Sequence, residues 1–169
     1  MRNIIFSEKQ KFNQKWLWII LFFLAIIPIS LLVFGKDFKL GASGGYIGVT
    51  VMLLPIILIS LAELRVEVSE DSLKYQFFPF HIKVYEIRFA DIDSFTELIY
   101  SPLKDYGGWG IKNSFSGIAY NVSGNKGVKI FLKNGKKVLF GTQKPHKFFE
   151  ALNKACLLYT SPSPRDPTS

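Results

Sequence analysis

The side chains that stand out for their chemistry lie in a glycine-rich segment around residue 108. Tyr106-Gly-Gly-Trp-Gly110 places an indole among glycines, and Lys112 follows it. A Trp in such a loop can enter lipid headgroups or fill a partner's pocket, or it can cover the open end of a small β domain. We predict an interaction loop formed by Tyr106, Trp109 and Lys112. The glycines do not form a dinucleotide fingerprint, because no helix follows and the third glycine is absent.

Lysines form a second set of candidate binding residues. Each lysine close to an anionic lipid surface contributes about 1 kcal/mol to binding. A plain solvated face is the other interpretation of such a cluster. The predicted anionic-lipid contacts are Lys126, Lys129, Lys136 and Lys137.

Groups that catalyse reactions or hold metals are sparse. His81 and His146 are the only histidines, and Cys156 is the single cysteine, so no metal-ligand spacing appears. No nucleophile elbow is visible either. We predict a protein that is not an enzyme, with no cofactor and no metal. The alternative is an accessory enzyme or transport component acting on a lipid or envelope substrate, using Asp91, Asp93 or His81.

The charge balance narrows the range of partners. The 169 residues include 21 Lys and Arg against 13 Asp and Glu, which gives a net charge of +8. A basic balance suits nucleic acid or an anionic surface. No Arg-rich recognition helix, zinc-finger spacing or RNA-binding motif accompanies it. We therefore expect no nucleic-acid partner.

Two long apolar runs lie in the first third of the chain, Trp16–Phe34 and Tyr46–Ala62. An uncharged helix of about 20 residues reaches across the roughly 30 Å of a bilayer's hydrocarbon core. The runs predict a transmembrane helical hairpin over 16–62, with helices at 16–34 and 45–62. The short connection Gly35–Gly45 makes the two helices antiparallel.

The basic residues of segment 1–15 precede the first apolar run. By the positive-inside rule, they predict a multi-pass protein of the plasma membrane with cytoplasmic N- and C-termini. The lipid bilayer is then the first expected partner. A membrane-protein partner and a homo-oligomer are the further candidates.

Short alternating segments follow over 64–155. Period-two alternation predicts strands, and Asn134-Gly135 between two of them signals a hairpin. Pro145 opens a helix with apolar residues at helical spacing. This predicts an α+β or mainly β domain, a bent antiparallel sheet or partial barrel of about seven strands with one C-terminal helix. The predicted strands are 64–69, 72–78, 82–88, 92–100, 117–123, 128–133 and 136–142.

The order of these elements resembles that of membrane-anchored bacterial pleckstrin-homology-like domain proteins. The resemblance rests on LRVEVSEDSLKYQF, on IRFADIDSF, and on KIFLKNGKKVLFGTQKPHKFFEAL as a final hairpin leading into a helix. YGGWGIK and GIAYNVSGNKGV are similar to a small uncharacterised membrane-protein family in that group. The resemblance implies the architecture. Because the β domain carries no catalytic constellation and directly follows the two predicted spans, we expect a membrane-anchored, non-enzymatic interaction module that binds a membrane-protein partner, itself or lipid headgroups.

The last residues, 156–169, differ in composition from the rest. Three prolines occur between Pro162 and Pro167. Cys156 to Asp166, CLLYTSPSPRD, resembles a translated reading frame of a sequencing-library adapter. We therefore interpret 156–169 as a non-native tail, and expect the pleckstrin-homology-like domain to end near Ala155.

Overall fold

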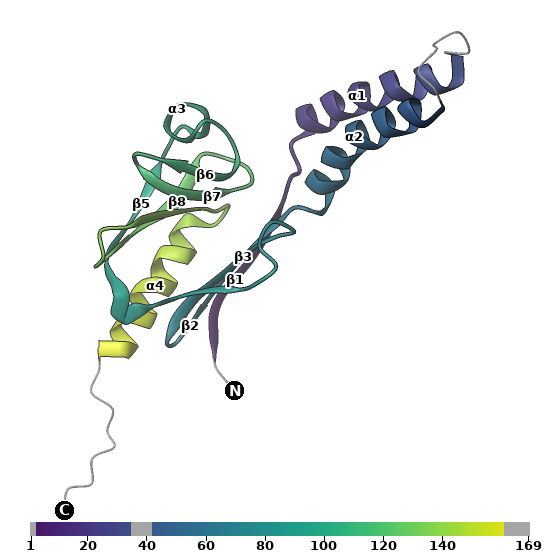
Figure 1. The fold of residues 1–169 in the computed structure, drawn as a ribbon. Coiled ribbons are helices and arrows are strands. Elements are labelled where there is room, and N and C mark those ends of the chain that lie inside the picture. Colours follow the sequence, from purple (N-terminus) through teal and green to yellow (C-terminus); the bar gives the residue numbers. More distant parts are fainter. Residues whose placement is uncertain (1–2, 35–41, 161–169) are drawn as a thin grey trace, which may run out of the picture. The chain divides into compact units, whose positions relative to one another are not determined.

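The computed structural model describes residues 3–34 and 42–160 (Figure 1). The chain divides into two compact units, one formed by Met1–Gln10 with Glu63–Ser169 and the other by Lys11–Ala62. The second unit contains the helices α1 (Lys15–Phe34) and α2 (Ala42–Leu61). All the sheet structure belongs to the first unit, apart from the last residue of strand β1.

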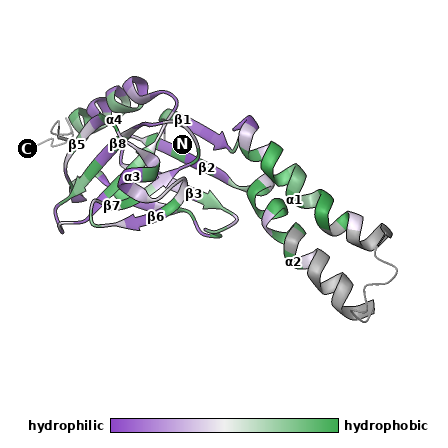
Figure 2. Cartoon of the chain, turned by 90° about the horizontal axis from the view of Figure 1, so that it is seen from above, coloured by the Kyte–Doolittle hydropathy of each residue, from purple (hydrophilic) through white to green (hydrophobic). Residues whose placement is uncertain are grey.

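The α1–α2 unit carries apolar side chains on its surface. The described part of α1 is hydrophobic along its length (Figure 2), and Phe22 and Phe23 are both more than half exposed. Val51 and Ile57 of α2 are exposed in the same way. Trp18 Nε1 donates to the carbonyl oxygen of Phe12 at 2.8 Å, which fixes the approach to α1.

The predicted transmembrane hairpin is wrong. Across the described ranges, no helix combines the length and the apolar character needed to cross a membrane. The runs at 16–34 and 45–62 do form helices, α1 and α2, but neither is a candidate span within the described residues. The predicted localisation, a multi-pass plasma-membrane protein with cytoplasmic termini, depended on these spans and is therefore also wrong. Most of the predicted connection 35–45 lies outside the described residues.

The N-terminal segment shows why its charges were misleading. Ile4–Lys11 form strand β1, at the edge of a sheet. The Glu8 carboxylate accepts hydrogen bonds from Thr142 Oγ1 and, at 3.0 Å, from the Gln143 amide. Gln10 Nε2 donates to the Gly141 carbonyl at 2.8 Å. Two of the basic residues used to orient the chain, Lys9 and Lys11, therefore alternate with the buried Glu8 and Gln10 along a strand.

Two sheets build the larger unit. In the four-stranded sheet the order is β1-β2-β3-β4, and β3 pairs antiparallel with both β2 and β4. In the five-stranded sheet the order is β5-β8-β9-β7-β6, and only β7 and β9 are parallel. The strands after β1 are β2 (Glu63–Ser69), β3 (Ser72–Phe78), β4 (Tyr85–Arg88), β5 (Ile92–Ile99), β6 (Gly110–Ser114), β7 (Gly117–Asn121), β8 (Lys126–Leu132) and β9 (Lys137–Gly141).

Three helical segments complete this unit: η1 (Phe89–Asp91), α3 (Pro102–Tyr106) and α4 (Pro145–Thr160). Phe148 of α4 is fully buried, stacks on Phe6 at 5.2 Å and meets Phe140 edge to face at 6.4 Å. α4 therefore packs with β1 and β9 in the main core. That core also contains Leu64, Val66, Leu73, Phe77, Val128, Ile130 and Leu152.

The predicted fold class needs correction in the β domain as well. The described residues form nine strands in two sheets, with a parallel pair in the five-stranded sheet, and not one bent antiparallel sheet or partial barrel of seven strands. β6 was missed because Gly110–Ser114 lies in the polar, glycine-rich stretch. α4 continues past Ala155 to Thr160, and the prolines of the predicted tail lie outside the described residues.

Candidate functional site

On the five-stranded sheet, three lysines from three strands lie on the same outer face. Residues directly opposite each other in a sheet share a face. Lys112 pairs with Ala119, Ala119 with Leu139, Leu139 with Lys129, and Lys129 with Thr96. This row crosses all five strands. Lys112 lies on the edge strand β6, and Lys129 lies on β8, next to the other edge strand β5.

A neighbouring row on the same face contributes the third lysine. Lys137 pairs with Phe131, which pairs with Ser94, and Lys137 lies two residues before Leu139 on β9. We call Lys112, Lys129 and Lys137 the lysine face. Within the described residues, none of the three forms a salt bridge with a carboxylate.

A small second hydrophobic core covers the centre of the lysine face, between Lys112 and Lys129. Ala119 and Leu139 have no exposed surface, because Tyr100, Tyr106 and Leu98 pack over them. The rings of Tyr100 and Tyr106 meet edge to face at 5.8 Å, a favoured aromatic geometry. Burial raises the pKa of both phenols, so they stay neutral and act as packing groups.

Helix α3 brings Tyr106 to this core, and local sequence explains why it forms. Ser101 is the N-cap, its hydroxyl accepting from the Lys104 amide at 3.5 Å, and Pro102 occupies the first turn, where proline fits best. Gly107 ends the helix with φ of +71°, and its amide donates to the Leu103 carbonyl at 3.1 Å. Such a left-handed cap favours glycine.

A hydrogen-bonded chain sets the start of β6. Asn121 Nδ2 donates to the Tyr100 hydroxyl at 3.1 Å, and its Oδ1 accepts from the Gly110 amide at 2.9 Å. A Cβ at Gly141 would lie 2.7 Å from Asn121 Cβ and 3.0 Å from the Tyr100 hydroxyl oxygen. The close approach therefore requires glycine at 141, and these hydrogen bonds position the start of β6, the strand that carries Lys112.

Lys129 experiences the electrostatics of this face most strongly. Its pKa is lowered first by burial and then by repulsion from Lys137, while attraction to Asp105 offsets part of the effect. Lys129 Nζ lies 5.8 Å from the centre of the Phe131 ring, within the range of a cation–π contact. A nearby anion would relieve the repulsion between the two ammonium groups.

The other predicted binding residues lie elsewhere. Lys126 begins β8 opposite Ile99, and its position three residues before Lys129 puts it on the opposite side of the strand. Lys136 is in the turn before β9. Trp109 is partly buried, and its Nε1 donates to the Gly124 carbonyl at 3.2 Å, joining two loops. The strand pairing thus places Lys112, Lys129 and Lys137 on one face of the sheet, to which Lys126, Lys136 and Trp109 do not belong.

A second cluster lies at one end of the main core, where His81 meets three tyrosines. Its ring centre lies 4.7 Å from that of Tyr85, 5.5 Å from that of Tyr120 and 6.4 Å from that of Tyr75. His81 Nδ1 is buried and has no hydrogen-bond partner in the described part of the chain. Burial lowers the pKa of His81, so the imidazole is held neutral.

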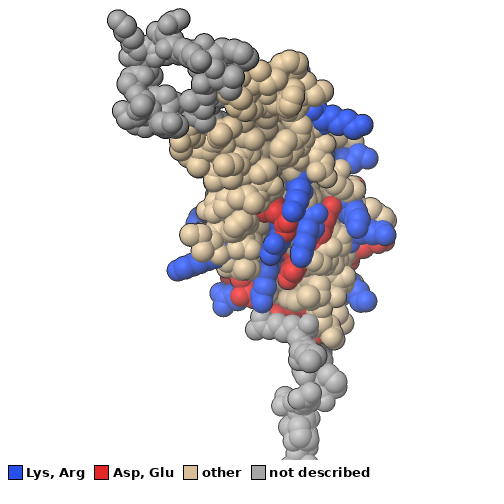
Figure 3. Space-filling view, turned by 90° about the vertical axis from the view of Figure 1, so that its right-hand side faces the viewer, with Lys and Arg blue, Asp and Glu red and all other residues tan. Residues whose placement is uncertain are grey.

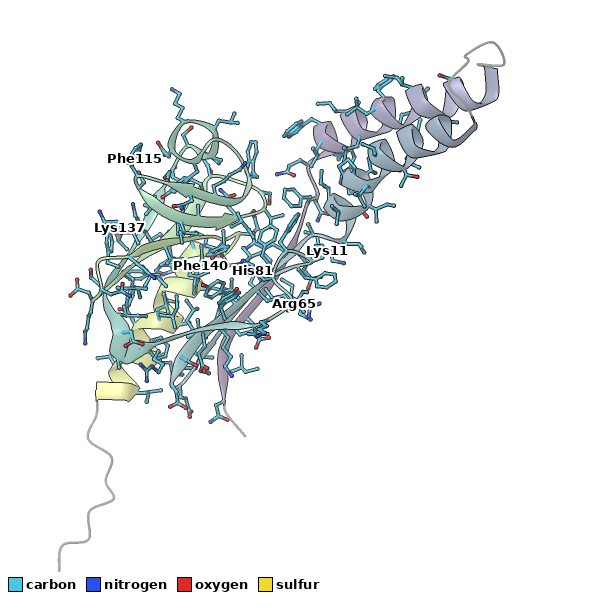
Figure 4. All side chains as sticks on the ribbon, in the orientation of Figure 1. Lys11, Arg65, His81, Phe115, Lys137 and Phe140 are labelled. Atoms are coloured by element: carbon cyan, nitrogen blue, oxygen red, sulfur yellow. The ribbon has the colours of Figure 1, made fainter. Side chains whose placement is uncertain are left out.

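The tyrosines around His81 supply protonated hydroxyls. Burial and a hydrogen bond with Tyr120 raise the pKa of Tyr75, and burial raises that of Tyr120. Phe140 closes the cluster, with its ring 4.9 Å from that of Tyr75 (Figure 4). The arrangement offers ring faces and hydroxyl donors and does not activate a nucleophile.

Asp91, Asp93 and His81, the residues of the alternative enzymatic interpretation, each contact a different set of side chains. Asp91 lies in η1 and binds Arg88, with 3.1 Å between Arg88 Nε and its Oδ2. Asp93 is exposed on β5 and accepts from Ser94. His81 contacts tyrosines. No group of three or more His, Cys, Asp and Glu gathers at metal-binding distances within the described ranges.

Sequence reasoning named the three lysines but missed helix α3 and the strand pairing that places the lysines on one face. The signal for α3 was present, because Ser101-Pro102 followed by Gly107 is a helix start and stop pattern. The pairing of β7 with β9, which joins Lys112 to Lys129 and Lys137, leaves no local signal in the sequence. Neither the models of known protein families nor the curated proteins gave a match to this chain.

Proposed function

We propose that the protein is a non-enzymatic interaction module that binds anionic lipid headgroups through the lysine face. The observation that carries this proposal is the placement of Lys112, Lys129 and Lys137 on one outer sheet face. Their neighbours in the rows are Ala119, Leu139, Thr96 and Phe131, and none of these neutralises a cation. The predicted resemblance to pleckstrin-homology-like domains agrees with this use and stays a prediction.

The electrostatic binding free energy expected from three lysines is large enough for reversible binding. Each lysine near an anionic lipid surface contributes about 1 kcal/mol, so three contribute about 3 kcal/mol, or roughly 100-fold in affinity. Salt screens charges beyond about 8 Å at physiological ionic strength. The proposed interaction must therefore weaken as salt is raised.

The test compares vesicles of phosphatidylcholine alone with vesicles that also contain phosphatidylserine, using the full chain. The readout is the part of binding that depends on phosphatidylserine, so that apolar adsorption common to both vesicles cancels. The triple variant Lys112→Gln, Lys129→Gln, Lys137→Gln is expected to lose roughly 100-fold in that part. The matched control, Lys126→Gln with Lys136→Gln, removes two exposed lysines that lie off this face.

The proposal fails if the triple variant and the parent chain bind phosphatidylserine equally, or if binding does not depend on phosphatidylserine. Urea unfolding of each variant verifies that the fold is retained. A control variant that loses as much as the triple variant would assign the effect to overall charge and would also overturn the proposal.

A further inference from the structure

The turn between β6 and β7 presents the most exposed large apolar side chain of the described residues. Ser114 pairs with Gly117 at the end of the hairpin, so Phe115 and Ser116 alone form the turn. Phe115 has a relative exposure of 110%. Tight hairpin turns favour Asn, Asp and Gly, and a lone Phe there gains nothing from the fold.

The turn needs no special backbone conformation at Phe115. Within the described residues, positive φ values occur only at glycines, among them Gly117 at +113°. The Ser114 hydroxyl accepts from the Ser116 amide at 3.2 Å. The backbone is therefore held by its neighbours, and the Phe115 side chain is presented on a short, fixed tip.

This tip is next to the lysine face. A Cβ at Gly117 would lie 2.3 Å from the Lys137 carbonyl oxygen and 2.7 Å from Lys137 Cβ. Phe115 is thus two residues from a point of direct backbone contact with Lys137, and Figure 4 labels both at the same side of the body. Phe131 occupies the same row as Lys137 on that face.

We propose that Phe115 is an apolar anchor that enters the lipid surface beside the headgroups bound by Lys137 and Lys129. This inference rests on the proposed function and adds the element that fixes orientation. An aromatic ring beside cations matches the layered chemistry of a lipid surface, where anionic headgroups lie directly above acyl chains. The hairpin tip directs the lysine face toward the headgroups, and no part of the chain has to cross the lipid.

The two contributions differ in their response to salt, and the experiment uses that difference. Binding of the full chain to phosphatidylcholine/phosphatidylserine vesicles is measured at low and high sodium chloride. Phe115→Ala is expected to weaken binding about tenfold at both salt concentrations, because apolar burial is not screened. The triple lysine variant is expected to lose most at low salt.

Ile99→Ala is the matched control. Ile99 is 73% exposed, but it pairs with Lys126 at the opposite end of β5 from the Ser94 row. It should leave vesicle binding unchanged. If Ile99→Ala weakens binding as much as Phe115→Ala, the anchor is not specific and the inference is wrong.

The remaining outcomes separate this inference from the proposed function. If Phe115→Ala binds like the parent chain while the triple lysine variant loses binding, the anchor is wrong and the lysine face stands. If the triple lysine variant also binds like the parent chain, the proposed function itself is wrong. If Phe115→Ala abolishes a concentration-dependent self-association, measured by sedimentation, and leaves vesicle binding intact, the occupant of the tip is a second copy and the inference is overturned.

Discussion

The outer faces of the two sheets differ in whether their lysines are paired with carboxylates on the neighbouring strands. On the four-stranded sheet, Lys74 lies between Glu67 on β2 and Glu86 on β4, and Arg65 binds Glu63. Figure 3 shows basic and acidic side chains interleaved on a face of the body. On the five-stranded sheet, Lys129 lies between Thr96 and Leu139.

The two sheets of one small unit therefore differ in whether their cations are paired with carboxylates across the strands. Opposite charges directly across a pair of strands stabilise each other by roughly 0.2–1 kcal/mol, so the four-stranded sheet neutralises its own cations. The lysine face has no carboxylate directly across the strands from its lysines, and the core that contains Tyr100 and Tyr106 packs over its centre.

The largest expected effect comes from breaking that core. Leu139→Ala should lower the free energy of unfolding by about 2–5 kcal/mol, because it leaves a cavity at a fully buried site. Lys74→Ala, at the middle of the mixed-charge face, should cost about 0.5 kcal/mol. Urea unfolding of both variants measures the difference. Equal losses would show that the second core does not support the lysine face.

The next effect concerns the close contact between β7 and β9. Gly117→Ala combines a positive φ with a collision against the Lys137 carbonyl, so we expect a loss of about 1–3 kcal/mol. Gly135→Ala, also at positive φ but with open space around it, isolates the backbone strain. Thermal or urea unfolding gives the comparison. A Gly117 variant no less stable than the Gly135 variant would contradict the proposed contact.

A third change should turn the mixed face into a second lysine face. Glu67→Lys with Glu86→Lys leaves Lys74 flanked by cations on both sides. Binding to phosphatidylserine vesicles should rise by about 1 kcal/mol for each added lysine, measured by sedimentation with vesicles at low salt. If binding does not rise, location on an outer sheet face is not enough, and the Phe115 tip must supply the difference.

The smallest expected effect is a pH dependence of stability that comes from His81, which lies on neither outer face. The pKa of His81 is lowered from the usual 6.5 by burial, so the unfolded chain binds a proton at higher pH than the folded chain. The contribution of neutral His81 to the free energy of unfolding is fully present above about pH 6.5. It declines as pH falls toward the folded pKa, by at most about 1.4 kcal/mol per pH unit. His81→Gln should reduce this slope in urea titrations between pH 7 and 5. An unchanged slope would assign the effect to other groups.

Parts of the fold were accessible from sequence, for identifiable reasons. The strands at 64–69 and 72–78 show clean alternation, and the structure has β2 and β3 within one residue of those limits. The Asn134-Gly135 turn and the Pro145 helix start were local signals and were found. The transmembrane interpretation failed because hydropathy located α1 and α2 but did not establish a span.

The candidate site was only half accessible. The sequence drew attention to Lys112, Lys129 and Lys137, but it grouped them with Lys126 and Lys136, which lie off the face. Sorting them required the parallel pairing of β7 with β9, a contact between segments with β8 between them in the chain. The tyrosines around His81 come from three different strands, and no spacing rule connects them.

The position of the helices within the chain has a consequence for the order of folding. β1 ends at Lys11 and β2 begins at Glu63, yet the two strands are neighbours in one sheet. Closing so long a loop costs only about 0.6 kcal/mol more for each doubling of its length, but non-local pairings form slowly. Glu8 and Gln10 also need Gly141–Gln143, near the end of the sheet region. β1 precedes the other described strands in the chain but is therefore expected to be the last of them to join its sheet.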